Sequence, residues 1–321
     1  KITKKYTPGP ANTVLVPNTQ YKAPKELTKL YDQVVGSLLW GANNWRPDST
    51  YQVTQLARFL ANPSYEHMDA AIDCLSYMIT TKDKGLLYTM NPHFAISKKL
   101  QGISFSDANW SKDSDAISTS GHLMHICTSH ETDLIVQSPP GIKPPLPLHN
   151  IISWCSRKQR NFIAISTEAS ETMAASLSTR QIEWTRGLFT ELGFTNDVQP
   201  LPGSKPLPPE VILEIKETEP PWLLLIDNSS SVANLNSGKI HKDNHQNTRL
   251  FAYVKNAIGN LRQVKPWKVN TLYNTADILT KLQTFPVHDG HCRSMLSTIS
   301  FLQSGIEPAT KISQSNKRQK L

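Results

Sequence analysis

The chain has 321 residues, with 34 Lys and Arg against 26 Asp and Glu, which leaves a net charge of +8. A positive excess of this size favours a polyanionic partner such as nucleic acid. Hydrophobic residues make up 38% of the chain, so it can build a core, and wholesale disorder is excluded. The longest purely aliphatic run, 223–226, is far shorter than the roughly 18 residues of a membrane span, so we expect no membrane partner.

Cysteine usage and the N-terminus bear on the setting of the protein. The four cysteines are scattered and form no Cys-x-x-Cys pair, which argues against a disulfide framework and a standard zinc module. No apolar stretch of a secretory signal follows the first residues, and the chain lacks an initiator Met. We therefore expect an intracellular piece of a longer chain.

The first part of the chain has the pattern of helices. Residues 1–24 read as an extended segment. Apolar residues then recur at three-to-four spacing, which predicts helices over about 27–39, from Pro47 and from Tyr65. Residues 25–97 are therefore expected to form a small helical subdomain.

Strand patterns begin after residue 98. Alternating or apolar runs predict strands at 103–107, 118–127, 151–155, 162–165 and 222–226, with a last strand around 268–272. A long helix is expected from Ser166 to Leu192, closed by Gly193, and a helical zone over about 244–258. This order predicts an α/β fold with a mixed sheet over residues 98–303.

Two proline-rich windows interrupt this second part. They hold five and seven of the 22 prolines, and we interpret them as insertions at about 130–149 and 197–221. Residues 304–321 are polar and basic, and we expect them to be a disordered tail.

Four acids lie where a catalytic site could form. Asp107 and Asp227 end strands, Glu171 lies in the first turns of a helix, and Asp277 lies in a short helical segment. Two divalent ions about 3.5–4 Å apart need several converging carboxylates. The alternative is that each acid is an ordinary cap or turn residue.

Histidines and basic residues suggest weaker sites. His122 and His125 should point to opposite faces of a strand, and the pairs His241/His245 and His288/His291 lack a second ligand pair with zinc spacing. A zinc module is thus disfavoured. The basic residues Arg157, Lys158 and Arg160 are placed by the sequence in a turn between strands, where they could neutralise phosphates or simply face solvent.

Several motifs in order resemble the RNase H domain of copia-type retrotransposon Pol polyproteins. They are Phe105-Ser-Asp-Ala-Asn-Trp110, Ser118-Thr-Ser-Gly-His122, Ile152-Ser-Trp-Cys-Ser-Arg-Lys-Gln159, Ile165-Ser-Thr-Glu-Ala-Ser-Glu-Thr-Met-Ala-Ala175, Ile226-Asp-Asn228 and Thr275-Ala-Asp-Ile-Leu-Thr-Lys281. Upstream, Tyr31-Asp-Gln-Val-Val-Gly-Ser-Leu-Leu-Trp40, Arg46-Pro-Asp48, Gln55-Leu-Ala-Arg-Phe59 and Gly85-Leu-Leu-Tyr88 resemble the end of the same family's reverse transcriptase.

The resemblance implies an RNase H-like fold, a five-stranded mixed sheet flanked by helices. It further implies an endoribonuclease that cuts the RNA strand of RNA–DNA hybrids through two Mg²⁺ ions, with Mn²⁺ as a substitute. Asp107, Glu171, Asp227 and Asp277 match the family's four acids. Asn109 stands where the family has a second acid in the first motif.

Residues expected at nucleic acid under this resemblance are Arg157, Lys158, Arg160, Asn228 and His245, the last preceding a helix as in the family. The partners implied are an RNA–DNA hybrid and the remaining Pol polyprotein, in a cytoplasmic virus-like particle or the nucleus. No Tyr-x-Asp-Asp is present, so no polymerase activity is expected in this chain. The alternative function is a degenerate, non-catalytic nucleic-acid-binding remnant.

Overall fold

Three helices open the computed structural model, which describes residues 2–89, 100–110, 117–137, 150–160, 164, 166–194, 220–237 and 248–298. Residues 2–24 run without helix or strand. The helical unit that follows consists of α1 (Lys25–Asn44), the 3-10 turn η1 (Pro47–Ser49), α2 (Thr50–Ala57) and α3 (Tyr65–Thr80). It has its own core, in which Tyr31, Val35, Val53 and Leu56 are fully buried.

The second part of the chain is built on a five-stranded sheet. Its strands are β2 (Gln101–Asn109), β3 (Thr119–Cys127), β4 (Ile151–Lys158), β5 (Trp222–Ile226) and β6 (Val264–Lys268). They lie in the order β4-β3-β2-β5-β6. The pairs β2/β3 and β3/β4 are antiparallel, whereas β2/β5 and β5/β6 are parallel. The sheet is therefore mixed, as predicted.

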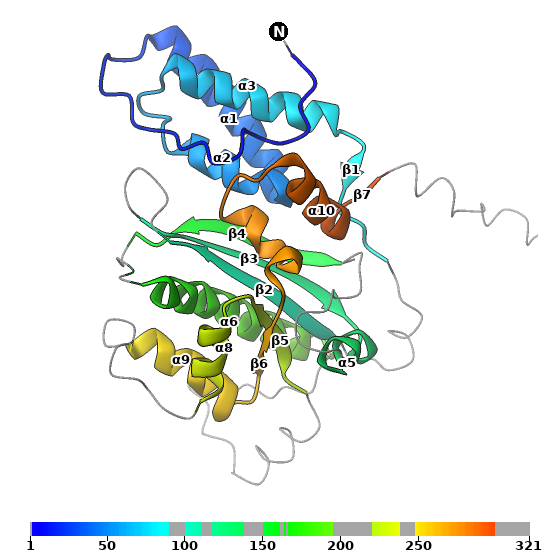
Figure 1. Ribbon diagram of the computed structural model, residues 1–321. Coiled ribbons are helices and arrows are strands. Elements are labelled where there is room, and N and C mark those ends of the chain that lie inside the picture. The colour runs from blue at the N-terminus through cyan, green and yellow to red at the C-terminus, as the bar shows by residue number, and fades with distance from the viewer. Residues whose placement is uncertain are drawn as a thin grey trace, which may run out of the picture.

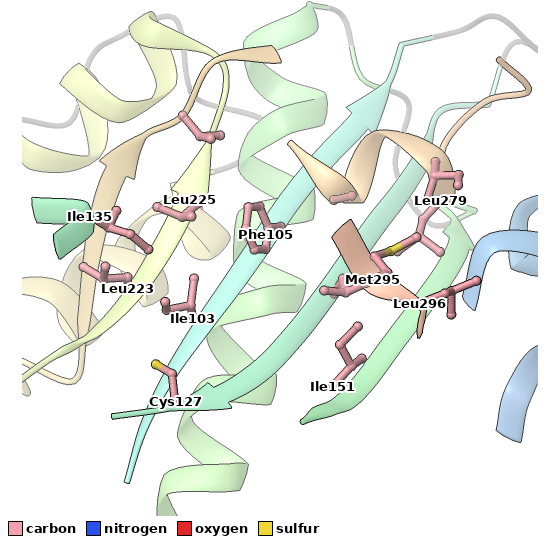
Figure 2. Close-up of a cluster of buried hydrophobic side chains, with 14 of the residues drawn as sticks. Ile103, Phe105, Cys127, Ile135, Ile151, Leu223, Leu225, Leu279, Met295 and Leu296 are labelled. Atoms are coloured by element: carbon pink, nitrogen blue, oxygen red, sulfur yellow. The ribbon is translucent and has the colours of Figure 1, made fainter. Parts of the chain in front are cut away.

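Helices cover both faces of this sheet. One face carries α6 (Thr167–Glu191), α8 (Ser229–Asn236) and α9 (Thr248–Gly259), and the other carries η4 (Thr275–Leu279), α10 (Phe285–Met295) and the helical unit (Figure 1). Along β5, Leu223 and Leu225 face one core while Leu224 and Ile226 face the other. Figure 2 shows the first of these cores, which also packs against Ile135 of α5 (Ser129–Gln137). A strand buried on both faces explains the continuous apolar run.

The long helix α6 begins and ends as the sequence predicts. The Ser166 side chain accepts a hydrogen bond from the Ala169 amide at 3.1 Å, which caps the first turn. Gly193 lies just beyond the end with φ +76°, a conformation that favours glycine. The position of Glu171 one turn into this helix follows from the cap.

The helical unit is joined to the sheet and to the end of the chain. Trp154 Nε1 of β4 donates to the Ala42 carbonyl of α1 at 2.8 Å. A two-stranded sheet pairs β1 (Lys84–Gly85) with β7 (Ser297–Thr298), near the last described residue. The two parts of the chain therefore pack as one body (Figure 1).

Two strand predictions are wrong in detail. The last strand is Val264–Lys268, not around 268–272; it contains Pro266, which is tolerated because β6 is an edge strand. Arg157 and Lys158 do not lie in a turn, because β4 continues beyond residue 155 and pairs with β3 up to Lys158.

Several expectations fall outside the described residues. They concern most of the strand at 162–165, His241 and His245, the windows 138–149 and 195–219, and the tail 304–321. The predicted helical zone over 244–258 is observed as α9, from Thr248 to Gly259. No described helix is both long and apolar enough to cross a bilayer.

Candidate metal centre

Three of the four predicted acids meet at one edge of the sheet. Carboxylate oxygens of Asp107, Glu171 and Asp227 all lie within 4.8 Å of one another. Asp107 and Glu171 are buried, and Asp227 is half-buried. Residues from a strand, a helix and a strand end therefore converge on one point.

The strand register explains this convergence. Ser106 of β2 pairs with Ile226 of the parallel strand β5, so the next residues, Asp107 and Asp227, lie side by side. The carboxyl ends of parallel strands open at the same edge of a sheet, where open α/β folds form their sites. Helix α6 packs against β2 and supplies Glu171.

The cluster is electrostatically unfavourable by itself. Burial, together with the charges of Asp277 and Asp227, raises the pKa of Asp107 to about 7. Burial and the neighbouring Asp107 and Asp227 raise the pKa of Glu171 well above its usual range. Glu171 Oε2 is buried with no hydrogen-bond partner among the described residues. A divalent cation with a preference for oxygen ligands fits these residues, because it would offset the repulsion and occupy the unpaired oxygen.

Asp277 lies beside the cluster on η4 but faces other partners. Lys281 forms an ion pair with its Oδ1, and Gln283 Nε2 donates to its Oδ2 at 2.7 Å. The charge of Asp277 still acts on Asp107. The structure therefore brings the fourth acid near the other three. Its oxygens are not part of the group that lies within 4.8 Å of one another.

The turn that carries Asp277 is fixed against the sheet by contacts that the sequence did not indicate. Thr280 Oγ1 donates to Asp107 Oδ2, and Asn109 Nδ2 donates to the Thr280 carbonyl at 3.1 Å. Gly121 allows the close approach, since a Cβ there would lie 2.8 Å from Thr280 Cγ2 and 2.9 Å from the Ala276 carbonyl oxygen. Asn109, which replaces an acid of the family motif, thus supplies an N–H that a carboxylate could not.

The residues expected at nucleic acid are dispersed. Arg157 and Lys158 lie at the end of β4, and Arg160 follows two residues later. The Asn228 side chain caps α8 by accepting from the Ser231 amide at 2.9 Å. His245 lies outside the described residues. The three basic residues lie together, whereas the side-chain oxygen of Asn228 already accepts a hydrogen bond from the first turn of α8.

A second group of possible ligands, Asp48, His288 and Cys292, has atoms within 4.8 Å of one another. Arg46 already donates to both Asp48 oxygens, at 2.9 and 2.8 Å, and Tyr77 donates its hydroxyl to the same carboxylate. Burial alone would raise the pKa of Asp48, but Arg46 holds it below the usual value. We interpret this group as a buried hydrogen-bond network that joins η1 and α3 to α10.

The histidines of β3, His122 and His125, contact side chains of neighbouring strands. Both His122 and His125 are buried on β3. His122 Nε2 lies 3.1 Å from Ser153 Oγ, and burial lowers its pKa to about 4. The His125 ring stacks against Phe105 with centroids 6.4 Å apart.

Several known proteins are similar in sequence to part of the chain. No protein-family model matches the chain. The retrovirus-related Pol polyprotein from transposon RE1 of Arabidopsis thaliana is 29% identical over 193 residues, 60% of this chain and 11% of that protein. Secreted RxLR effector protein 161 of Plasmopara viticola is 30% identical over 155 residues, 48% of this chain and 89% of that protein.

Among solved structures, the chain is similar to the N-terminal RNase H domain of rv2228c from Mycobacterium tuberculosis, solved as a fusion with maltose-binding protein. The identity is 10% and the TM-score 0.31, over 61% of this chain and 99% of the other. The strand order β4-β3-β2-β5-β6 and the mixed register define the fold of this chain.

The mixed sheet and the acids at its edge define an RNase H-like unit. Several relatives at about 29% identity or below are retrovirus-related Pol polyproteins from transposons. The chain is therefore similar in sequence to part of these polyproteins. The matched part of the chain spans 11% of the length of the RE1 polyprotein.

Proposed function

We propose that the chain is a ribonuclease H that hydrolyses the RNA strand of RNA–DNA hybrids during reverse transcription. The observation that carries this proposal is the convergence of Asp107, Glu171 and Asp227 at the carboxyl edge of β2 and β5. Three buried or half-buried carboxylates that raise one another's pKa make a poor structural element and a good ligand set for divalent metal.

In this proposal Asp107, Glu171 and Asp227 hold two Mg²⁺ ions, with Mn²⁺ as a substitute, and Asp277 completes the site from η4. When bound, such ions lower the pKa of a water molecule and offset charge on the scissile phosphate. Thr280 orients the Asp107 carboxylate by its hydrogen bond. Gln283 holds Asp277 in place. The attacking group is water, so no side chain is needed as a nucleophile.

The setting of this activity is also part of the proposal. Residues 25–97 are the end of a reverse transcriptase, and residues 98–303 are the ribonuclease H domain that follows it. The chain works within a larger Pol polyprotein, inside the cell, in a cytoplasmic virus-like particle or the nucleus. The similarity to transposon Pol polyproteins supports this placement.

The test is cleavage of a labelled RNA–DNA hybrid by the purified chain in Mg²⁺ and in Mn²⁺. Asp107→Asn is the control, because it preserves size and removes one ligand charge. Loss of RNA-strand cleavage in Asp107→Asn is the expected result. Hybrid binding without cleavage in either metal would refute the enzymatic proposal and leave the alternative, a non-catalytic binding remnant.

A further inference from the structure

A basic groove lies between the helical unit and the RNase H-like unit. It has a volume of about 520 Å³ and is bounded by α2, by the ends of β3 and β4, and by α6. Its lining includes Arg58 from α2's C-terminal cap, Arg157, Lys158 and Arg160 at the end of β4, and Arg180 from α6. Neither Arg58 nor Arg180 was expected at nucleic acid from the sequence.

The chemistry of the groove suits a polyanion. The residues that line it comprise five cations and no carboxylate. Two polar atoms in the lining are buried without a hydrogen-bond partner in the described part of the chain, Ser156 Oγ and Gln159 Oε1. Ser156 is 8% exposed, and its hydroxyl can donate to a phosphate oxygen. An unpaired buried hydroxyl beside five cations indicates a place for an anionic ligand.

The strand register places this groove at the same edge of the sheet as the acids. Asp107 pairs with Gly121 on β3, and Gly121 pairs with Ser156 on β4. Neighbouring strands lie about 4.8 Å apart, so the groove begins roughly 10 Å from Asp107. This separation equals about three nucleotides along one strand. Nucleic acid seated over the acids would therefore extend into the groove.

Arg58 is held in position before any ligand arrives. Its Nη1 donates to Gln55 Oε1 at 2.5 Å, and its guanidinium lies 5.5 Å from the centre of the Phe59 ring. On α6, Met173, Leu177 and Arg180 follow at spacings of four and three residues, which places them on one face of the helix. Both arginines thus reach the groove from rigid elements.

We propose that this groove binds the phosphodiester backbone of nucleic acid jointly from both units, with Arg58 of the helical unit and Arg180 of α6 contacting phosphates. The inference rests on the proposed function for the choice of polymer and extends it. The helical unit is then part of the substrate-binding surface and not only the end of a preceding domain.

The test measures binding without cleavage. A fluorescent RNA–DNA hybrid is titrated with the full chain carrying Asp107→Asn, in EDTA, over a range of salt concentrations. The slope of log K against log salt is negative, and each lost phosphate contact reduces its magnitude by about 1. The same loss weakens binding roughly 5- to 10-fold at 0.1 M salt. We expect this from Arg58→Gln and from Arg180→Gln, and about twice the change in slope from the double variant.

Two further variants serve as matched controls. Arg249→Gln removes the same charge from an exposed position on α9, outside the groove, and should leave the slope unchanged. Arg58→Lys keeps the charge and should retain the slope. Circular dichroism of each variant checks that the fold is intact.

Two outcomes would overturn the proposal. One is a salt slope for the double variant equal to that of Arg249→Gln. The other is displacement of the hybrid by polyglutamate as effectively as by single-stranded DNA of equal charge, because the groove would then take an acidic protein. Cleavage by the chain with an intact Asp107 is measured separately. Failure of catalysis with a preserved groove effect therefore refutes only the proposed function.

Discussion

Replacing Asp107 by Asn should stabilise the metal-free protein while removing its activity. The carboxylate is buried beside Asp277 and Asp227, and these surroundings raise its pKa from 3.8 to about 7. Asn has the same size, carries no charge and keeps an oxygen that can accept from Thr280. At pH 8 in EDTA the variant therefore avoids a buried negative charge that the parent chain must carry.

The size of the expected stabilisation follows from the raised pKa of Asp107. A folded-state pKa above the unfolded value means that the folded state binds more protons between about pH 4 and 7, so the free energy of unfolding falls as pH rises through that window. A shift from 3.8 to about 7 corresponds to on the order of 4 kcal/mol as an upper limit. At about 2 °C per kcal/mol for a chain of this length, Tm should rise by roughly 4–8 °C.

The assay is thermal unfolding at pH 5 and pH 8, in EDTA and in Mg²⁺. The parent chain should gain stability from Mg²⁺ at pH 8, because the ion binds the folded state, and Asp107→Asn should gain much less. Asp69→Asn, on an exposed position of α3, is the matched control. A lower Tm for Asp107→Asn than for this control in EDTA at pH 8, or an equal Mg²⁺ effect on both, would refute the reasoning.

Two further changes test the packing around the site. Gly121→Ala should lower the free energy of unfolding by about 1–3 kcal/mol and reduce hybrid cleavage, because the new Cβ would lie 2.8–2.9 Å from atoms of η4 and of Thr280. The control is Gly36→Ala, whose Cβ would have no atom within 4 Å. In urea unfolding this control should be neutral or stabilising. Asp48→Asn should cost about 3–5 kcal/mol, because it leaves the Arg46 guanidinium buried without its counter-ion. Asp73→Asn, at the partly exposed ion pair with Lys5, should lower the free energy of unfolding by less than about 1 kcal/mol. Similar losses in the two variants would contradict this expectation.

The sequence predicted those features that depend on local chemistry. A Ser cap and a Gly stop predicted α6, and a run of apolar residues predicted the buried strand β5. Strand ends and the order of motifs singled out Asp107, Glu171 and Asp227, which the structure brings together. These signals lie within a few residues of the feature they predict.

Contacts between distant segments could not be predicted in this way. Thr280 and Asp107 are 173 residues apart, and nothing in either motif indicates their hydrogen bond. Arg58 lies in the helical unit, where a basic residue at a helix end is ordinary until β4 is placed beside it. Helix α10 was not predicted, because its apolar residues Phe285 and Val287 are exposed while the polar residues His288 and His291 are buried.

The pairing of the last described strand with β1 has a consequence for what proteolysis would do to this chain. Strand β7 pairs with β1, and His288 of α10 lies with its Nε2 2.9 Å from the Tyr77 hydroxyl of α3. The last described helix thus completes the packing of the first ones. A protease cut between β1 and β2 would break the peptide bond but leave both fragments associated, so we expect them to copurify. Such a nicked product would keep the helical unit beside the acids.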